Sequence, residues 1–419
     1  MKQKSKILAM ILAGGRVNDL NVLTYYRPKS AVPFGGFARV IDFPLSNLMN
    51  SGLERVAILS QYRSYSLINH IGSSAAWDMI GRHRGISILP PYIGYGSAQW
   101  YRGSADAVFQ NLDFIQYNNP EVLLILSGDH IYQMDYREII NYHLEKDADL
   151  TMACLQVDID KAHRFGVAQI DDEDGDKGGR VVSYIEKPEQ PEFNWASLTV
   201  FCFKPQVLYE VLEQNIQEDE SFEFGRDIIP RMMKDNRRVY GYKFKGYWGY
   251  TRTIDEFWQT NMDLLGPDPK IHFDQWKIRT NLEHRGICDC QPLKVGNEAR
   301  ISDSLIYNGC IIEGEVEHSI LFPGTHVKKG AKVKDSVLFF NNVVGEGAQL
   351  NKIISDVNTT FGSMVKVGEP GDPAAKETTV IGWNNTIPTS TVIGSGCTLN
   401  PSLPQRKIPK IIQSGEVVR

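Results

Sequence analysis

A six-residue repeat in the last third of the chain constrains the fold most. Three segments beginning at Ser304, Ser319 and Ser336 each place apolar residues after the serine, at spacings of 15 and 17 residues. Within this stretch apolar residues fall six apart, and the phase then slips: Leu321, Val327, Val333 and Phe339, followed by Val344 and Leu350. Six residues per side and three sides per coil predict a left-handed parallel β-helix. Such coils cannot bury their ends alone and usually serve assembly.

The first half of the chain has a different rhythm, in which apolar strands alternate with helical segments. This alternation predicts a parallel, doubly wound α/β sheet with ligands beyond the carboxyl ends of its strands. The strands expected in this part are Ile7–Leu12, Val56–Leu59, Ile86–Leu89 and Val122–Leu126. Strand-like segments with few helices follow and predict a mixed extension: Leu150–Val157, Gly166–Ile170, Val181–Glu186 and Leu198–Phe203.

These patterns divide the 419 residues into two domains, with boundaries set by Pro-rich and irregular stretches. The segment Gly266-Pro267-Asp268-Pro269 ends the first domain. We expect an α/β domain over residues 1–266, a linker over 267–291 and the β-helix domain over 292–419, which would serve assembly or regulation.

Composition excludes several partners. A net charge of −5 argues against nucleic acid, because no broad basic surface is implied. The longest apolar runs are far shorter than the roughly 20 residues of a membrane span, and the first one reads as a strand, not a signal peptide. The six cysteines are scattered, and the one close pair, Cys288 and Cys290, is a poor zinc signal. Reduced thiols and a cytoplasmic location are therefore expected.

Two strand ends carry residues suited to phosphate chemistry. Ala13, Gly14 and Gly15 directly follow the first strand, and such small residues allow backbone N–H groups to approach a phosphate closely, although a plain tight turn has the same composition. The G-x-G-x-x-G and G-K-[ST] signatures are absent. Asp129 follows Gly128 at the end of another apolar strand, where it would be either a ligand for a Mg²⁺–phosphate complex or a helix N-cap.

The stretch Leu12–Gly36, LAGGRVNDLNVLTYYRPKSAVPFGG, resembles the nucleotide-binding signature of sugar-nucleotide pyrophosphorylases. Downstream motifs narrow the resemblance to ADP-glucose pyrophosphorylases (glucose-1-phosphate adenylyltransferases), over nearly the whole chain. The resemblance implies a Rossmann-like nucleotidyltransferase domain followed by a left-handed β-helix. It also implies Mg²⁺-dependent synthesis of ADP-glucose and pyrophosphate from ATP and glucose 1-phosphate, for glycogen or storage-glucan synthesis, in an allosteric homo-oligomer, a tetramer being favoured.

The resemblance assigns roles residue by residue. The segment Trp100–Ala107 is similar to the family's W-Y-R-G-T-A-D-A, and Glu223-Phe224-Gly225-Arg226-Asp227 is similar to its sugar-contacting D-F-G-K-D. Glu186-Lys187-Pro188, which alone would read as a solvated surface segment, matches the element that binds the sugar phosphate. The predicted site residues are Asp129, Lys29, Arg16 and Arg252 for catalysis; Ala13, Gly14, Gly15, Gln61 and Gly103 for the nucleotide; Tyr101, Glu186, Lys187, Ser197, Glu223 and Trp248 for the sugar phosphate; and Asp129 and Asp19 for the metal.

The chain departs from the family where catalysis matters. Asp19 replaces an arginine, Tyr250 replaces the aspartate that is the second metal ligand, and Arg252 replaces a glycine. An acid and a base are thus exchanged between two loops that the family places at one triphosphate, and the formal charge is unchanged. We hypothesise that Asp19 takes part in metal binding and that Arg252 neutralises phosphate charge. Smaller departures are Val17, Ser30 and Thr199, the last in place of a glycine.

Other functions stay open on the sequence alone. One is a catalytically impaired regulatory subunit that forms a hetero-oligomer with a catalytic paralogue, motivated by Asp19 and Tyr250. Another is a pyrophosphorylase for a different nucleotide or sugar phosphate. A third is a β-helix acyltransferase, for which the repeat is short and His318 and His326 lack supporting motifs.

Overall fold

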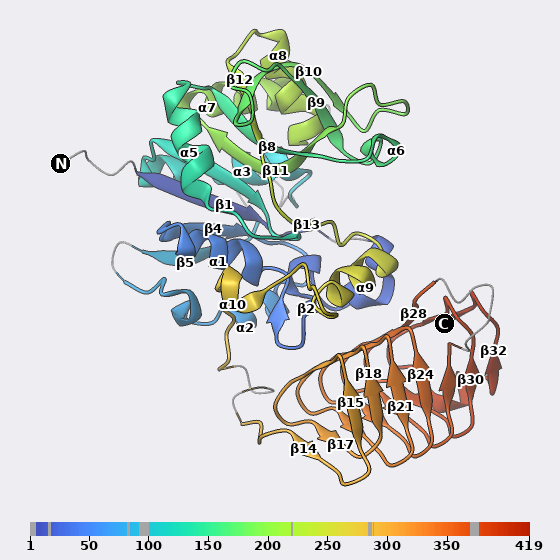
Figure 1. The fold of residues 1–419 in the computed structure, drawn as a ribbon. Helices are drawn as coiled ribbons and strands as arrows, with labels where there is room; N and C mark the ends of the chain where they lie inside the picture. Colours follow the sequence, from blue (N-terminus) through green and yellow to red (C-terminus); the bar gives the residue numbers. More distant parts are fainter. Residues whose placement is uncertain are drawn as a thin grey trace.

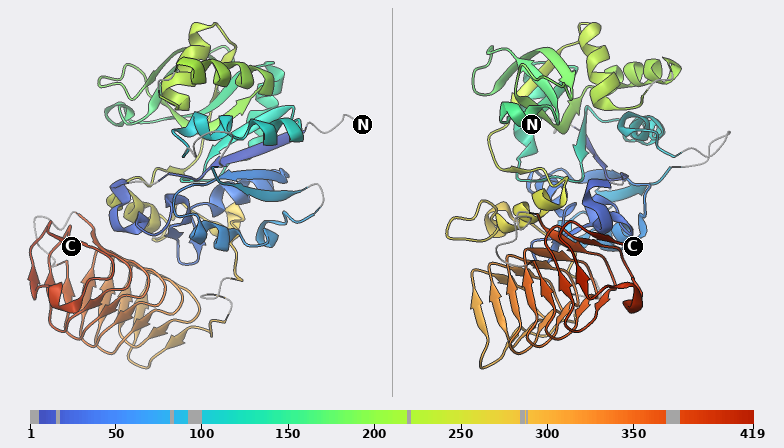
Figure 2. Two further views of the ribbon diagram at one scale, coloured as in Figure 1. Left: turned by 180° about the vertical axis from the view of Figure 1, so that it is seen from behind. Right: turned by 90° about the vertical axis from the view of Figure 1, so that its right-hand side faces the viewer.

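The computed structural model describes residues 6–15, 18–81, 84–91, 100–218, 221–283, 287, 289–368 and 377–419. An α/β domain holds the chain as far as the yellow helices, and a three-sided coil coloured orange to red lies against one end of it (Figure 1). The same two-part arrangement is seen from behind and from the side (Figure 2). Within the described ranges, no helix is long and apolar enough to cross a membrane.

The α/β domain is built on one nine-stranded sheet of the described residues. Its order is β5 (Gly85–Leu89), β4 (Arg55–Leu59), β1 (Ile7–Leu12), β6 (Val122–Ser127), β11 (Trp195–Phe203), β8 (Leu150–Gln156), β12 (Val239–Lys243), β10 (Gly178–Glu186) and β9 (Gly166–Ile170). The first four strands are parallel, as predicted. The predicted mixed extension continues the same sheet, because β11 pairs antiparallel with both β6 and β8.

Helices and two small ribbons complete this domain. The ribbons pair β2 (Pro33–Phe34) with β3 (Ala38–Arg39) and β7 (Ile131–Tyr132) with β13 (Trp248–Gly249). The α-helices are α1 (Asp42–Asn50), α2 (Tyr65–Ile71), α3 (Ser104–Phe109), α4 (Leu112–Asn118), α5 (Tyr136–Glu145), α6 (Ile159–Ala162), α7 (Pro205–Glu218), α8 (Ile229–Lys234), α9 (Ile254–Met262) and α10 (Phe273–Trp276). Residues 224–228 form a π-helical turn before α8.

The apolar spacing of Val108, Leu112 and Ile115 predicts one helix after Trp100, whereas the structure has two, α3 and α4. Asn111 separates α3 from α4 with a non-helical backbone. Its Nδ2 donates to the Ala107 carbonyl at 2.8 Å and to the Tyr101 hydroxyl at 3.0 Å. An asparagine that bonds locally in this way competes with helical hydrogen bonding, which is why the helix is interrupted here.

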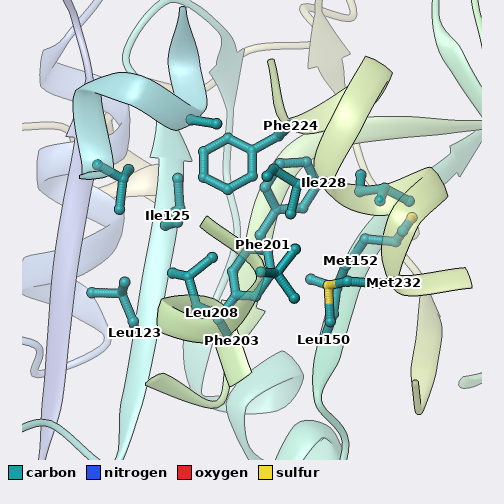
Figure 3. Close-up of a cluster of buried hydrophobic side chains, with 14 of the residues drawn as sticks. Leu123, Ile125, Leu150, Met152, Phe201, Phe203, Leu208, Phe224, Ile228 and Met232 are labelled. Atoms are coloured by element: carbon teal, nitrogen blue, oxygen red, sulfur yellow. The ribbon is translucent and has the colours of Figure 1, made fainter. Parts of the chain in front are cut away.

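A layer of apolar side chains packs on one face of the sheet, over strands β6, β8 and β11 (Figure 3). Phe201 and Phe203 of β11 lie beside the buried residues of β6 and β8, and Phe224, Ile228 and Met232 cover them. Strands buried on both faces read as continuous apolar runs, which explains why β6 was recognisable from sequence. The layer also anchors Phe224, whose neighbours Glu223 and Gly225 reach the cavity described below.

The coil has three parallel sheets, as expected of the predicted β-helix. One contains β14 (Lys294–Val295), β17 (Ile311–Ile312), β20 (His326–Val327), β23 (Val343–Val344), β26 (Thr360–Phe361) and β29 (Thr386–Ile387). The second contains β15 (Arg300–Ser302), β18 (Glu315–Glu317), β21 (Lys332–Lys334), β24 (Gln349–Asn351), β27 (Lys366–Val367), β30 (Val392–Ile393) and β32 (Ile411–Ile412). The third contains β16 (Leu305–Ile306), β19 (Ile320–Leu321), β22 (Val337–Leu338), β25 (Ile353–Ser355), β28 (Thr379–Ile381), β31 (Thr398–Leu399) and β33 (Val417–Val418).

The interior register corrects one detail of the predicted repeat. Leu338, not Phe339, continues the inward series, because it pairs with Leu321 of the preceding coil and belongs to the same interior cluster. Phe339 instead packs outside the coil, with its ring 6.4 Å from that of Phe257 in α9. The step of five residues therefore falls between Val333 and Leu338, one side of the coil earlier than the apolar pattern suggested, and Phe339 faces the α/β domain.

The two domains share an apolar and charged interface. Ile320, Phe322 and Phe339 on the third coil sheet cluster with Phe34 and Phe257 of the α/β domain. Beside them lies a buried ion pair in which Arg27 contacts Asp356 at 2.8 Å. The segment expected as a linker contains α10, and Trp276 of that helix packs edge-on against Phe43 of α1 at 6.2 Å.

Candidate active site

A cavity of about 630 Å³ opens at the carboxyl ends of the parallel strands. Residues from the ends of β1, β4 and β6 line one part, and residues from β10, β11 and the turn before α8 line another. The predicted site residues that line it are Ala13, Gly14, Gly15, Lys29, Gln61, Tyr101, Gly103, Asp129, Glu186, Lys187, Ser197, Glu223, Trp248 and Arg252. Arg16 lies outside the described residues. Asp19 is not among the described residues that line the cavity, but it accepts a hydrogen bond from Arg252, which does line it.

The glycine loop and the Tyr101 segment are held together by Gln61. The side chain of Gln61 donates to the Tyr101 carbonyl at 3.2 Å and accepts from the Tyr101 backbone N–H at 2.7 Å. On its other side, a Cβ at Gly14 would lie 3.3 Å from Gln61. Gln61 therefore positions two walls of the cavity, and its amide is already occupied by Tyr101.

Tyr101 and Gly103, which the resemblance assigned to ligand binding, also have structural roles. The Tyr101 hydroxyl donates to the Leu89 carbonyl at 3.0 Å, so it stiffens the wall of the cavity. A Cβ at Gly103 would lie 2.1 Å from the Phe222 carbonyl oxygen. Only glycine allows the chain to pass so close, whatever binds in the cavity.

Asp129 lies at the centre of the charged part of the cavity. Its carboxylate contacts Lys29 Nζ at 3.1 Å and His130 Nε2 at 3.3 Å, and it accepts a hydrogen bond from Ser127. Burial alone would raise the pKa of Asp129, but Lys29, His130 and Ser127 together hold it well below its usual range. The group is thus an anion with 28% of its side chain exposed toward the cavity. The N-cap alternative was wrong, since Asp135 caps the next helix, α5.

Tyr250 lies among cations opposite this carboxylate. Arg252 Nη1 donates to the Tyr250 hydroxyl at 2.8 Å, and Arg164 and Lys29 lie 5.3 and 5.6 Å from the centre of its ring. Burial raises the pKa of Tyr250, so the hydroxyl stays neutral. The ring also stacks on Trp248 at 5.2 Å. The arginines of this wall are each paired with a carboxylate, Arg164 with Glu256 and Arg252 with Asp19.

Arg252 has a second partner across the cavity mouth. Its Nε lies 3.2 Å from Asp19, and the two side chains are 41% and 53% exposed. The two loops that carry these substitutions, an acid at Asp19 and a base at Arg252, are therefore in contact. Exposed pairs of this kind contribute little to stability, so the pair can separate at small cost when a ligand competes for Arg252.

The other end of the cavity is polar and built from closely packed chains. Glu186 accepts from the Tyr184 hydroxyl at 2.8 Å and lies 3.4 Å from Lys187. A Cβ at Gly225 would lie 2.3 Å from the Glu186 carboxylate. The Ser197 hydroxyl is buried and has no hydrogen-bond partner among the described residues.

Glu223 is held by Ser104, the first residue of α3. Its carboxylate accepts from the Ser104 hydroxyl at 2.5 Å and from the Ser104 backbone N–H at 3.3 Å. The same hydroxyl accepts from the Phe224 N–H at 3.1 Å. Glu223 therefore joins the two walls that Gly103 allows to approach.

Comparisons with known proteins agree with this architecture. The family model for nucleotidyl transferases matches residues 8–266, and the model for the GlmU-like C-terminal hexapeptide matches residues 292–382. The glucose-1-phosphate adenylyltransferase of Thermotoga neapolitana is 41% identical over 98% of this chain and 98% of its own length. That of Desulfitobacterium hafniense strain Y51 is 40% identical over 94% and 98%, and that of Bacillus mycoides is 40% identical over 84% and 92%. The chain belongs to the ADP-glucose pyrophosphorylase family.

Several residues of this pyrophosphorylase cavity were missed from sequence. Arg164 follows α6 and Tyr184 lies in β10, and neither belongs to a recognisable motif. Ser127 and His130 carried a usable signal, since they flank Gly128 and Asp129 at the end of β6. Their position in the sequence indicates that they lie near the Asp129 carboxylate, but not which of their atoms contact it.

The donor set fits a metal that arrives with a phosphate ligand. Among the described residues, no group of three or more histidine, cysteine or acidic side chains could enclose an ion. Mg²⁺ commonly uses one or two carboxylates together with substrate phosphates, and Asp129 supplies one ionised carboxylate at the cavity wall. Asp129 would hold such an ion, and the Asp19 carboxylate lies instead on Arg252.

Proposed function

We propose that this protein transfers the adenylyl group of ATP to glucose 1-phosphate, with Mg²⁺ as cofactor, for the synthesis of glycogen or another storage glucan. The observation that carries this proposal is a single cavity with two chemically different ends. Asp129 and Lys29 lie at one end, and Glu186, Lys187 and Ser197 lie at the other. An ion–phosphate complex fits the first end, and a polar sugar with a phosphate fits the second.

In this reaction a phosphate oxygen of glucose 1-phosphate bonds to the α-phosphorus of ATP. The bond from that phosphorus to the departing pyrophosphate breaks, and no group of the protein is modified. Catalysis of this kind depends on positioning and on neutralising charge. Bound Mg²⁺ would supply part of that neutralisation.

The protein's own cations supply the rest. Lys187 would hold the attacking phosphate as a point charge, since its side chain is 42% exposed beside Glu186. Lys29 and Arg252 would hold the triphosphate, with Arg252 exchanging Asp19 for a phosphate oxygen. The backbone of Gly14 and Gly15 would bring N–H groups to the same ligand.

Purified protein assayed alone tests the proposal. We expect pyrophosphate release that requires both ATP and glucose 1-phosphate, and the same assay with other nucleoside triphosphates and sugar phosphates measures preference. Arg252→Ala should lower turnover on the order of 10²-fold or more. Asp19→Asn is its matched partner, and it should weaken Mg²⁺ activation if Asp19 also reaches the metal.

The alternative is a regulatory subunit, favoured by the neutral Tyr250 opposite Asp129. It predicts no turnover with any nucleotide, unchanged behaviour of both variants, and a change in activity only when the chain is mixed with a catalytic paralogue. That combination of results would overturn the enzymatic proposal.

We further propose a homo-oligomer, with a tetramer favoured, in the cytoplasm. The first coil supports assembly, because Val295, Ile301 and Leu305 there are 50%, 39% and 36% exposed, on strands that pair on one side only within the described part of the chain. The described cysteines are free thiols, which suits a reducing compartment. Sedimentation of the full chain tests the assembly, and a monomer at working concentration would contradict it.

A further inference from the structure

Thr199 has an unusual backbone on the wall of the cavity. Its φ is +52°, and it is the one β-branched residue with positive φ in the part of the chain that the structure describes. A branched Cβ in this left-handed region crowds the backbone, so glycine is the residue that normally occurs there. Such outliers persist where the surroundings over-determine them, and they gather at functional sites.

A bulge in β11 creates this conformation. The pairing of β11 with β8 shifts register between Ser197 and Phe201, so Thr199 lies within the irregular stretch. Bulges of this kind re-aim side chains next to active sites. Thr199 and Ser197 both line the cavity.

The neighbours of Thr199 place it between the two ends of the cavity. Val200 pairs with Leu126 of β6, so Thr199 lies beside Ser127, which donates a hydrogen bond to Asp129. Ser197 lies two residues before Thr199 in β11, and its buried hydroxyl has no hydrogen-bond partner among the described residues. Thr199 thus separates the end suited to reacting phosphates from the end suited to the sugar.

We propose that Thr199 determines which hexose 1-phosphate the cavity accepts, by limiting the size of the substituent on sugar carbon 2. This inference rests on the proposed adenylyl transfer. Carbon 1 carries the phosphate, and its ring neighbours are the ring oxygen and carbon 2, of which only carbon 2 bears a substituent that varies among hexoses. A side chain at the junction of sugar and phosphate therefore meets a carbon-2 hydroxyl or an acetamido group. Threonine leaves less room for the larger group than glycine would.

The test compares the full-length parent with Thr199→Gly and Thr199→Asn. Asparagine tolerates the left-handed conformation and keeps the space filled, so it is the matched control. Calorimetry measures the Kd of glucose 1-phosphate and of 2-acetamido-2-deoxyglucose 1-phosphate, with Mg²⁺ and an ATP analogue that cannot be cleaved between its α and β phosphates. Steady-state assays measure kcat/KM for the same two sugars and KM for ATP.

We expect Thr199→Gly to shift selectivity toward the acetamido sugar on the order of tenfold or more, as for other pocket-size changes. Thr199→Asn should keep the parent's preference, and KM for ATP should stay unchanged in both variants. Thr199→Ser, which removes one methyl group, should give a smaller shift in the same direction. Thermal unfolding confirms that each variant is folded, and the serine variant decides the matter if the glycine variant is not.

An unchanged ratio of the two sugars in folded Thr199→Gly, or an equal shift in Thr199→Asn, would overturn the inference. The proposed reaction fails separately. Absent turnover with a shifted binding ratio refutes adenylyl transfer alone, whereas normal turnover with an unshifted ratio refutes sugar selection alone. A parent protein that binds neither sugar phosphate refutes both.

Discussion

Replacing Asp356 by asparagine should lower the free energy of unfolding by about 3–5 kcal/mol, the usual cost of removing one partner from a buried ion pair. Arg27 Nη2 contacts both carboxylate oxygens of Asp356 at 2.8 and 3.0 Å, and the two side chains are only 6% and 1% exposed. Burial raises the pKa of Asp356 even though Arg27 opposes this shift. The pair therefore offsets a large desolvation cost, and Asp356→Asn would leave the Arg27 charge buried without its partner.

A matched double variant distinguishes the cost of leaving one charge buried and unpaired from the cost of losing the packing contact. Arg27→Met combined with Asp356→Leu removes both charges together, and such replacements are often neutral or stabilising by about 1–4 kcal/mol. Equilibrium urea unfolding of parent, single and double variants gives the three free energies. Tryptophan fluorescence is a suitable probe, because the centre of the Trp383 ring lies 5.7 Å from Arg27 Cζ. Circular dichroism tests whether both domains unfold together.

A loss of less than about 1 kcal/mol in Asp356→Asn would refute this reasoning, because an uncompensated buried charge costs more. A double variant as unstable as the single one would refute it too, since packing and not charge would then hold the interface. Activity provides a further check. Arg27 lies two residues before Lys29, which contacts Asp129 at 3.1 Å, so Asp356→Asn should also lower turnover.

Three further predictions concern single residues. Asp129→Ala should lower turnover on the order of 10²-fold or more while circular dichroism stays unchanged, and near-normal turnover in the folded variant would contradict a role in holding the metal. Lys187→Ala should raise KM for glucose 1-phosphate and leave KM for ATP nearly unchanged, because a charge that grips the sugar phosphate throughout contributes uniform binding; a shift in the ATP value instead would contradict it. Burial, with Lys204 nearby, lowers the pKa of His143 to about 4, below an unfolded value of about 6.5. The unfolded chain therefore takes up the proton first as pH falls, so the free energy of unfolding should drop on the order of 3 kcal/mol between pH 6.5 and 4. The free energy of unfolding of His143→Gln should fall less over that pH range. An equal fall would show that groups other than His143 cause the pH dependence.

Features that depend on neighbours along the chain could be predicted from the sequence. The strands β1, β4 and β6 were readable because strands buried on both faces need continuous apolar runs. The coil was readable because each side repeats its interior residue every six positions. Asp129 was identifiable because the carboxyl ends of parallel strands meet at one edge of the sheet.

The contacts of individual side chains could not be predicted, because their partners lie far away in sequence and come together only in the fold. Arg252 and Asp19 are 233 residues apart, and Arg27 and Asp356 are 329 residues apart, so no local pattern could pair them. Phe339 leaves the interior series because the α/β domain offers it a second apolar surface. Thr199 has a positive φ because it lies in a bulge of β11, where the register with β8 shifts between Ser197 and Phe201. Local propensity sets which elements form, whereas these contacts depend on how the elements pack.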